Sequence, residues 1–299
     1  MPPWPSLPYE EWRDTRDTLH MYTQVIGKIR LTLAPLEPEW ANVPLYVTPR
    51  GLGTSAIPSG LQCFDIEFDF VEHELVIRSS DGGVDSIALR GQDVADFYHE
   101  VLAALGRLGI SVTINELPQE VPDPIPFPDD RTHHAYDPTY AHRFWQVLVR
   151  VDTVMKRYRA TFTGKASAVH FFWGTFDLAT TRFSGRAADP PPGSGVIMRL
   201  AEDAEQVSQG FWPGDERMPS PGFYAYGYPQ PAGCDTVESR PSGTAWNDTA
   251  RLFVLPYDTV REAQDPAAAL TQFLESTYEN LSGLMGWSPD LVAAGRHRD

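Results

Sequence analysis

Cysteine is almost absent from this sequence, which has only Cys63 and Cys234 among its 299 residues. Two cysteines provide neither a disulfide framework nor a zinc ribbon. Residues 1–5 lack the basic and apolar regions of a secretory leader. No apolar run approaches the roughly 20 residues that cross a bilayer. We therefore expect a cytoplasmic protein with reduced thiols and no membrane partner.

Positive charge is also scarce. The sequence has 24 lysines and arginines against 40 aspartates and glutamates, which gives a formal net charge of −16. A surface of this sign repels phosphate backbones and anionic lipids, so we expect no nucleic-acid partner. Hydrophobic residues make up 42% and charged residues 21%, as in an ordinary globular protein. Composition leaves the oligomeric state open.

Several catalytic signatures are missing as well. The sequence contains no Walker loop, no Rossmann glycine fingerprint, no His-Glu-x-x-His motif and no Gly-x-Ser-x-Gly elbow. We predict no cofactor. A metal ion held by His20, His170, Asp177 and Glu205 stays an open alternative, although no spacing among these residues demands it.

Apolar periodicity predicts four amphipathic helices, with Asp93 and Asp265 as N-caps of the second and fourth. Their ranges are 12–33, 93–108, 140–162 and 265–284. β-rich runs predict strands at 43–48, 63–70, 74–79, 85–89, 110–114, 169–173, 176–183, 196–200, 223–228 and 251–255. This order predicts an α+β fold, mostly antiparallel sheet in two related, closely packed halves covered by long amphipathic helices.

A proline-rich segment separates the two halves. The five prolines between residues 117 and 130 remove amide donors and exclude a central strand or helix there. We therefore place an N-terminal half at 1–116, a connector at 117–136 and a C-terminal half at 137–299. Residues 186–222 form a long irregular loop in this prediction, which suits a lid or binding loop.

The two halves have similar patterns, which suggests an internal duplication. Each has a helix with a tryptophan, then a Gly-Lys pair, then strands that reach a Thr-x-Arg sequence. Such short similarities arise by chance as readily as by duplication.

The segment 164–186 is the most informative part of the chain, because it mixes titratable and cationic groups with aromatic rings. The groups are Lys165, His170, Asp177, Arg182 and Arg186, and Trp173 is among the rings. An unbroken strand would place His170 and Arg182 on one face and Asp177 on the other. A turn at Gly174 would instead bring Asp177 to the histidine. An internal network of ion pairs is the alternative to a pocket.

A second candidate set lies on the first helix. His20, Gln24 and Lys28 are spaced by four residues, so their side chains stack along one edge. Such a row can bind a carboxylate or phosphate and move a proton, or simply form a solvated helix edge. A third set is aromatic: Trp212 in a turn, then Tyr224 and Tyr226 on one face of a strand.

With these residues assembled, the chain resembles a bacterial family catalogued only as a domain of unknown function, number 5996, over about residues 4–287. The resemblance rests on the segments 19–28, 169–174, 181–186, 210–214 and 255–257. It implies no activity, substrate or cofactor.

We expect an enzyme that acts on a small anionic or aromatic-acid substrate between the halves. In this hypothesis Lys165, Arg182 and Arg186 bind the anion, and His170 acts as general acid or base with help from Asp177. The alternatives are a non-catalytic small-molecule binding or sensing protein with the same pocket, and a scaffold that docks another protein through an aromatic surface.

Overall fold

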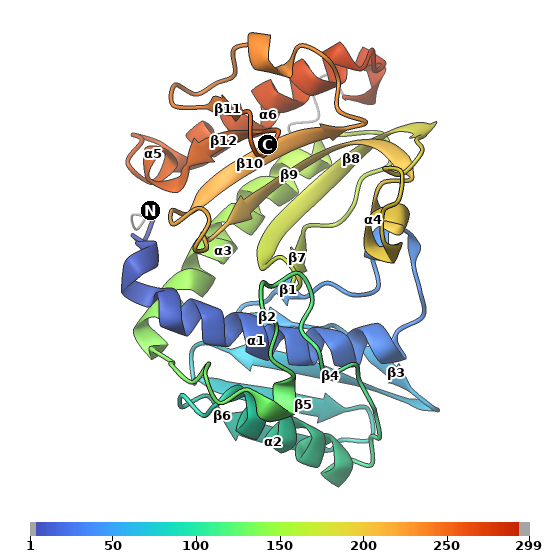
Figure 1. The fold of residues 1–299 in the computed structure, drawn as a ribbon, viewed down its shortest axis with the longest axis vertical. Coiled ribbons are helices and arrows are strands. Elements are labelled where there is room, and N and C mark those ends of the chain that lie inside the picture. Colours follow the sequence, from blue (N-terminus) through green and yellow to red (C-terminus); the bar gives the residue numbers. More distant parts are fainter. Residues whose placement is uncertain (1–3, 293–299) are drawn as a thin grey trace.

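The computed structural model describes residues 4–292 and contains two six-stranded antiparallel sheets. One sheet belongs to each half of the chain, and helices pack on both (Figure 1). This arrangement confirms the predicted α+β fold. No helix in the described part of the chain is long and apolar enough to span a membrane.

The N-terminal half places its sheet beside helices α1 and α2. The strand order is β1-β2-β4-β5-β6, and β3 pairs with β4. The helices pack together through Tyr22 and Phe97, whose stacked ring centroids are 3.9 Å apart. The bounds are α1 Tyr9–Leu33, η1 Pro38–Trp40, β1 Tyr46–Val47, β2 Gly51–Gly53, β3 Ile57–Ser59, β4 Gln62–Asp69, β5 Glu74–Ser79, β6 Val84–Ala88 and α2 Val94–Arg107.

The C-terminal half has the strand order β11-β12-β10-β9-β8-β7. Helices α3 and α6 cover one face of this sheet, and α1 crosses below the end that carries the β7–β8 turn (Figure 1). The bounds are η2 Phe127–Asp129, α3 Pro138–Ala160, β7 His170–Phe172, β8 Asp177–Ala187, α4 Val196–Ala201, β9 Ala204–Trp212, β10 Gly222–Tyr228, η3 Cys234–Thr236, β11 Ala245–Asn247, β12 Leu252–Pro256, α5 Tyr257–Arg261, α6 Pro266–Leu284 and η4 Pro289–Leu291.

The two halves share one hydrophobic core. Leu45 and Phe171 exchange backbone hydrogen bonds of 2.9 Å in both directions, which links the halves directly. The rings of Phe144 and Phe176 stack at 5.3 Å, and Phe144 also contacts Trp12 of α1. The halves are therefore held together by buried apolar surface, which fixes the space between them.

Local signals in the sequence identify the four long helices and the N-caps of two of them. Asp93 accepts a hydrogen bond from the Asp96 amide, and Asp265 accepts one from the Ala268 amide, as N-caps do. Two predicted strands are wrong. Residues 196–200 belong to α4, and residues 110–114 form no strand. In the latter segment Ile110 and Ile114 are buried, but no neighbouring strand pairs with it. The irregular loop expected at 186–222 is also wrong in part, because it contains α4 and the inner strand β9, which ends at Trp212.

Candidate functional site

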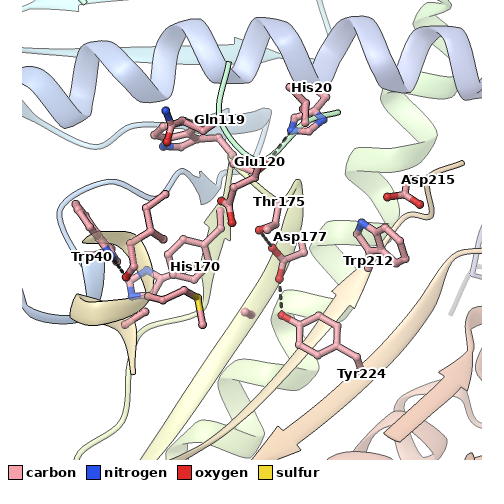
Figure 2. A pocket seen from close by; sticks show the side chains of 18 of the residues that line it. His20, Trp40, Gln119, Glu120, His170, Thr175, Asp177, Trp212, Asp215 and Tyr224 are labelled. Atoms are coloured by element: carbon pink, nitrogen blue, oxygen red, sulfur yellow. Dashed lines mark hydrogen bonds between the residues drawn. The ribbon is translucent and has the colours of Figure 1, made fainter. Parts of the chain in front are cut away.

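A cavity of about 1280 Å³ lies between α1, the connector and the uncovered face of the C-terminal sheet. Helix α1 contributes His20 and Lys28, and the connector contributes Glu120. The sheet contributes side chains from β7, β8, β9 and β10, and Figure 2 shows several of them directed into this space. Cavities of this size bind small molecules in other proteins.

Strand pairing determines which side chains of the segment 164–186 reach the cavity. The chain turns between β7 and β8, so that His170 pairs with Ala179 and Phe172 with Asp177. Directly paired residues point to the same face of a sheet, so His170 and Asp177 share the cavity face. Alternation along β8 then sends Arg182 to the opposite face, against α3 and α6.

Asp177 is the most unusual group in the cavity. Its carboxyl accepts hydrogen bonds from the hydroxyls of Thr175 and Tyr224 (Figure 2). The residue is only 6% exposed, and no cation pairs with it within residues 4–292. Burial raises the pKa of Asp177, and the two hydroxyl bonds only partly oppose that effect.

Glycine at position 210 explains how Tyr224 reaches Asp177. Strand β9 lies between β8 and β10, and Gly210 pairs with Tyr224 on one side and with Ala179 on the other. A Cβ atom at Gly210 would lie 2.4 Å from the Tyr224 hydroxyl oxygen. The absence of a side chain therefore lets the tyrosine ring lie across β9 toward β8.

A second carboxyl faces Asp177 from the connector. Glu120 retains solvent access, and Figure 2 shows its side chain pointing toward His170 and Asp177. Partial burial, and then the negative charge of Asp177, raise the pKa of Glu120. Within residues 4–292 neither group pairs with a cation, so the two carboxyls favour retaining at least one proton.

His170 lies in the cavity wall between the rings of Tyr46 and Phe172. It is 5% exposed, and its Nδ1 atom has no hydrogen-bond partner within the described residues. Burial, and then the positive charges of Arg30 and Arg159, lower the pKa of His170 to about 4. The imidazole is therefore neutral near pH 7 and can accept a proton.

The row on α1 divides into structural and cavity residues. His20 Nε2 donates to the Gly174 carbonyl oxygen at 2.9 Å, and burial lowers the pKa of His20 to about 3. The Gln24 side chain donates to the Gln119 carbonyl at 2.7 Å and accepts from the Gln119 amide at 2.9 Å. Gln24 does not line the cavity. His20 and Gln24 thus hold the β7–β8 turn and the connector in place.

Lys28, the last residue of that row, lines the cavity and is only 2% exposed. Its ammonium group forms no hydrogen bond and no ion pair within residues 4–292. Burial lowers the pKa of Lys28 to about 8.

The three cations expected to bind an anion do not line the cavity. Arg182 lies on the covered face, where it donates to the Tyr158 carbonyl at 2.5 Å and sits over the rings of Tyr158 and Tyr278. Arg186 pairs with Glu205 at 2.6 Å, and Lys165 pairs with Glu39 at 2.6 Å. The expectation that these three residues bind an anion in the cavity is therefore wrong. Strand alternation places Arg182 on the opposite face of the sheet, and Lys165 and Arg186 form ion pairs and do not line the cavity.

The remaining aromatic candidates form walls. Trp173 is 5% exposed and lies against Gly27 of α1, where a Cβ would come within 2.3 Å of its ring. Trp212 and Tyr226 also line the cavity. The rings of Tyr224 and Tyr226 stack at 6.3 Å, so the predicted tyrosine face of the strand does face the site.

A second buried acid was not identified from the sequence. Glu202, 4% exposed, follows α4 and accepts a hydrogen bond from Gln206 at 2.9 Å. The Tyr226 hydroxyl approaches it at 3.5 Å. Burial raises the pKa of Glu202 to about 7. No local signal marks it, since its partners come from two strands that the sequence does not pair.

Acidic groups dominate the cavity walls. The carboxyls are Asp17, Glu39, Glu120, Asp123, Asp177, Glu202, Asp215 and Glu216. Against them stand Arg16, Lys28 and Arg217, of which Arg16 pairs with Asp17 and Arg217 with Asp215. A multiply charged anion would be repelled from such a space. Among residues 4–292 there is no group of three or more His, Cys, Asp or Glu side chains placed to hold a metal ion.

Comparison with known proteins provides a family but no function. The model of a family described as a family of unknown function, DUF5996, matches residues 4–294. No curated protein and no solved structure matches the chain.

Proposed function

Since the chain belongs to the DUF5996 family, whose description gives no activity, we propose a function from its own geometry: an enzyme that transfers protons on a small molecule held between the two halves. Asp177 and His170 are the acid–base groups of this proposal. Both side chains lie on the same face of the same strand pair, and both border the cavity.

The isolation of the Asp177 carboxyl carries the proposal. A buried carboxylate without a cation is costly for a folded protein, because it loses the stabilisation that water provides. Structural carboxyls usually avoid this cost by pairing with arginine or lysine. A buried acid that keeps a raised pKa at the wall of a cavity is instead characteristic of catalytic sites.

The two groups have complementary properties. Burial raises the pKa of Asp177 and lowers that of His170, so the aspartate retains a proton more readily while the imidazole stays neutral. Asp177 is therefore the candidate acid of the pair, and the neutral His170 imidazole is the candidate base. The proposed reaction class is therefore abstraction and return of a proton, as in isomerisation, hydration or elimination.

The walls of the cavity favour a substrate with an aromatic or apolar body and polar substituents. Trp173, Trp212 and Tyr224 supply flat aromatic surface, while the acidic groups supply hydrogen-bond acceptors. Lys165, Arg182 and Arg186 lie outside the cavity, and of the cations that line it Arg16 and Arg217 are paired with carboxylates. The substrate class proposed here is therefore small, polar and not multiply anionic.

The test is turnover by Asp177→Asn. A panel of aldehydes, ketones, amides and phenols is incubated with the purified protein, and consumption is followed by mass spectrometry. Asparagine preserves the shape but not the proton, so we expect a loss of about 100-fold or more for any compound that wild type consumes. Glu262→Gln, an exposed carboxyl change, serves as the control and should keep full turnover.

Equal turnover by wild type and Asp177→Asn would contradict the assignment. Binding of a panel compound with no turnover would favour the non-catalytic alternative that uses the same cavity.

A further inference from the structure

Lys28 differs from the other lysines of this chain. The sequence contains only three lysines, Lys28, Lys156 and Lys165. The side chains of Lys156 and Lys165 are 59% and 60% exposed, and each pairs with a carboxylate at 2.6 to 2.7 Å. Lys28 is 2% exposed, lines the cavity and has no partner within residues 4–292.

Burial alone lowers the pKa of Lys28, and no charged group among residues 4–292 contributes to that shift. Gly27, the preceding residue, packs against the Trp173 ring, and the indole nitrogen of Trp173 donates to the Val43 carbonyl at 3.0 Å. Leu31, one turn further along α1, lines the same cavity. An ammonium group in this environment has neither full hydration nor a counter-charge. The neutral amine is therefore favoured relative to an exposed lysine, in agreement with a pKa lowered to about 8.

A buried, unpaired amine at a cavity has two chemical uses. It can bind an anion, or in its neutral form it can attack a carbonyl carbon. The carboxyls that dominate the same cavity repel anions but do not hinder an uncharged carbonyl compound. The charge distribution therefore favours the second use.

We propose that Lys28 condenses with a small, uncharged aldehyde or ketone in the cavity to form an imine. The amine lone pair forms a C–N bond to the carbonyl carbon, and the carbonyl oxygen gains a proton. Loss of the second N–H proton and of the C–O bond then releases one water molecule and leaves C=N. No oxidant or reductant is required.

This inference extends the proposed function, and the use of the imine in catalysis rests on that function. Once its nitrogen is protonated, the imine makes the neighbouring C–H bond more acidic than the parent carbonyl does, and this is the bond that an acid–base pair would act on. The formation of the imine itself requires only Lys28 and the cavity, so it can be tested separately from Asp177.

The test is reductive labelling of the folded, full-length protein with benzaldehyde and sodium cyanoborohydride near neutral pH. Hydride reduces the C=N bond to a stable benzylamine, and peptide mass spectrometry locates the added mass. We expect Lys28 to be labelled at least about tenfold faster than Lys156 or Lys165, because more of its amine is neutral at that pH. Since the comparison is made within one wild-type molecule, it does not depend on whether a variant folds.

Variants provide the matched controls. Lys28→Arg, which keeps the charge but cannot form an imine, should abolish the fast phase of labelling. Lys156→Arg should leave that phase unchanged. Labelling confined to Lys156 and Lys165, or an unchanged fast phase in folded Lys28→Arg, would overturn the proposal.

An anion-binding role is a separate outcome of the same study. Thermal stabilisation by benzoate that disappears in Lys28→Arg or Lys28→Met, without benzaldehyde labelling of Lys28, would overturn the imine in favour of an anion site. Asp177→Asn should retain the fast labelling. If the Asp177→Asn variant kept full turnover, that result would count against the acid–base proposal but not against imine formation at Lys28.

Discussion

At the scale of single residues, the same side-chain types serve opposite purposes in this protein. Arg182 and Lys28 are both buried cations, yet Arg182 is held by the Tyr158 carbonyl, the Thr161 hydroxyl and aromatic rings, whereas Lys28 has no partner within residues 4–292. The sequence shows that a cation is present but not whether it is satisfied. The structure therefore separates an arginine with several partners from a lysine without one among the described residues.

Arg182→Met tests the structural role of this arginine. The change removes the cation–π contacts and the hydrogen bonds that the guanidinium donates to the Tyr158 carbonyl and the Thr161 hydroxyl, so we expect a loss of about 2–3 kcal/mol in the free energy of unfolding, measured with urea. Because Arg182 does not line the cavity, labelling of Lys28 by benzaldehyde should be unchanged in the folded variant. Slower labelling without loss of stability would contradict this role.

Glu202 predicts a pH dependence of stability. Its pKa is raised from 4.5 to about 7 on folding, so the folded state binds the proton more tightly than the unfolded chain. The protonated Glu202 therefore contributes fully to the free energy of unfolding below pH 4.5, the pKa in the unfolded chain. This contribution is lost as the pH rises through 7. Glu202→Gln removes this titration.

The free energy of unfolding, measured with urea at pH values on either side of this window, checks the effect. As the pH rises, wild type should lose on the order of 2 kcal/mol more free energy of unfolding than the Glu202→Gln variant does, after allowance for solvent screening. Glu262→Gln is the control and should follow wild type. Parallel curves for Glu202→Gln and wild type would show that Glu202 titrates normally.

At the scale of elements, strand register determines the composition of the site. Alternation predicts that Tyr224 and Tyr226 share a face, and they do. Alternation alone could not decide whether Asp177 or Arg182 shares a face with His170, because the answer depends on the turn between β7 and β8. Register between β8, β9 and β10 then brings Tyr224 to Asp177, and nothing local in the sequence specifies that pairing.

Gly210→Ala tests this register. The new methyl group would collide with the Tyr224 ring and displace its hydroxyl from Asp177, so we expect a loss of about 1–3 kcal/mol in the free energy of unfolding. The same change in a Tyr224→Ala background should cost much less, because the colliding ring is absent. Equal costs in the two backgrounds would show that the close approach is not present in solution.

At the scale of the whole molecule, the sequence predicted the α+β class and the principal helices, because these depend on local periodicity and capping. The cavity could not be predicted in the same way. Its walls come from α1, the connector and the strands of the C-terminal sheet, which are distant in sequence and meet only through long-range packing. The connector, expected as a spacer, also contributes Glu120 to the site. Internal duplication of the two halves stays a prediction.

The most direct test of the account is the titration of the Asp177 carboxyl carbon by nuclear magnetic resonance. If the group is buried at the cavity without a cation, its midpoint lies clearly above the ordinary value of 3.8 in the free protein. A midpoint at or below that value would mean that a positive group neutralises Asp177. The central claim, an isolated acid available for proton transfer, would then be wrong.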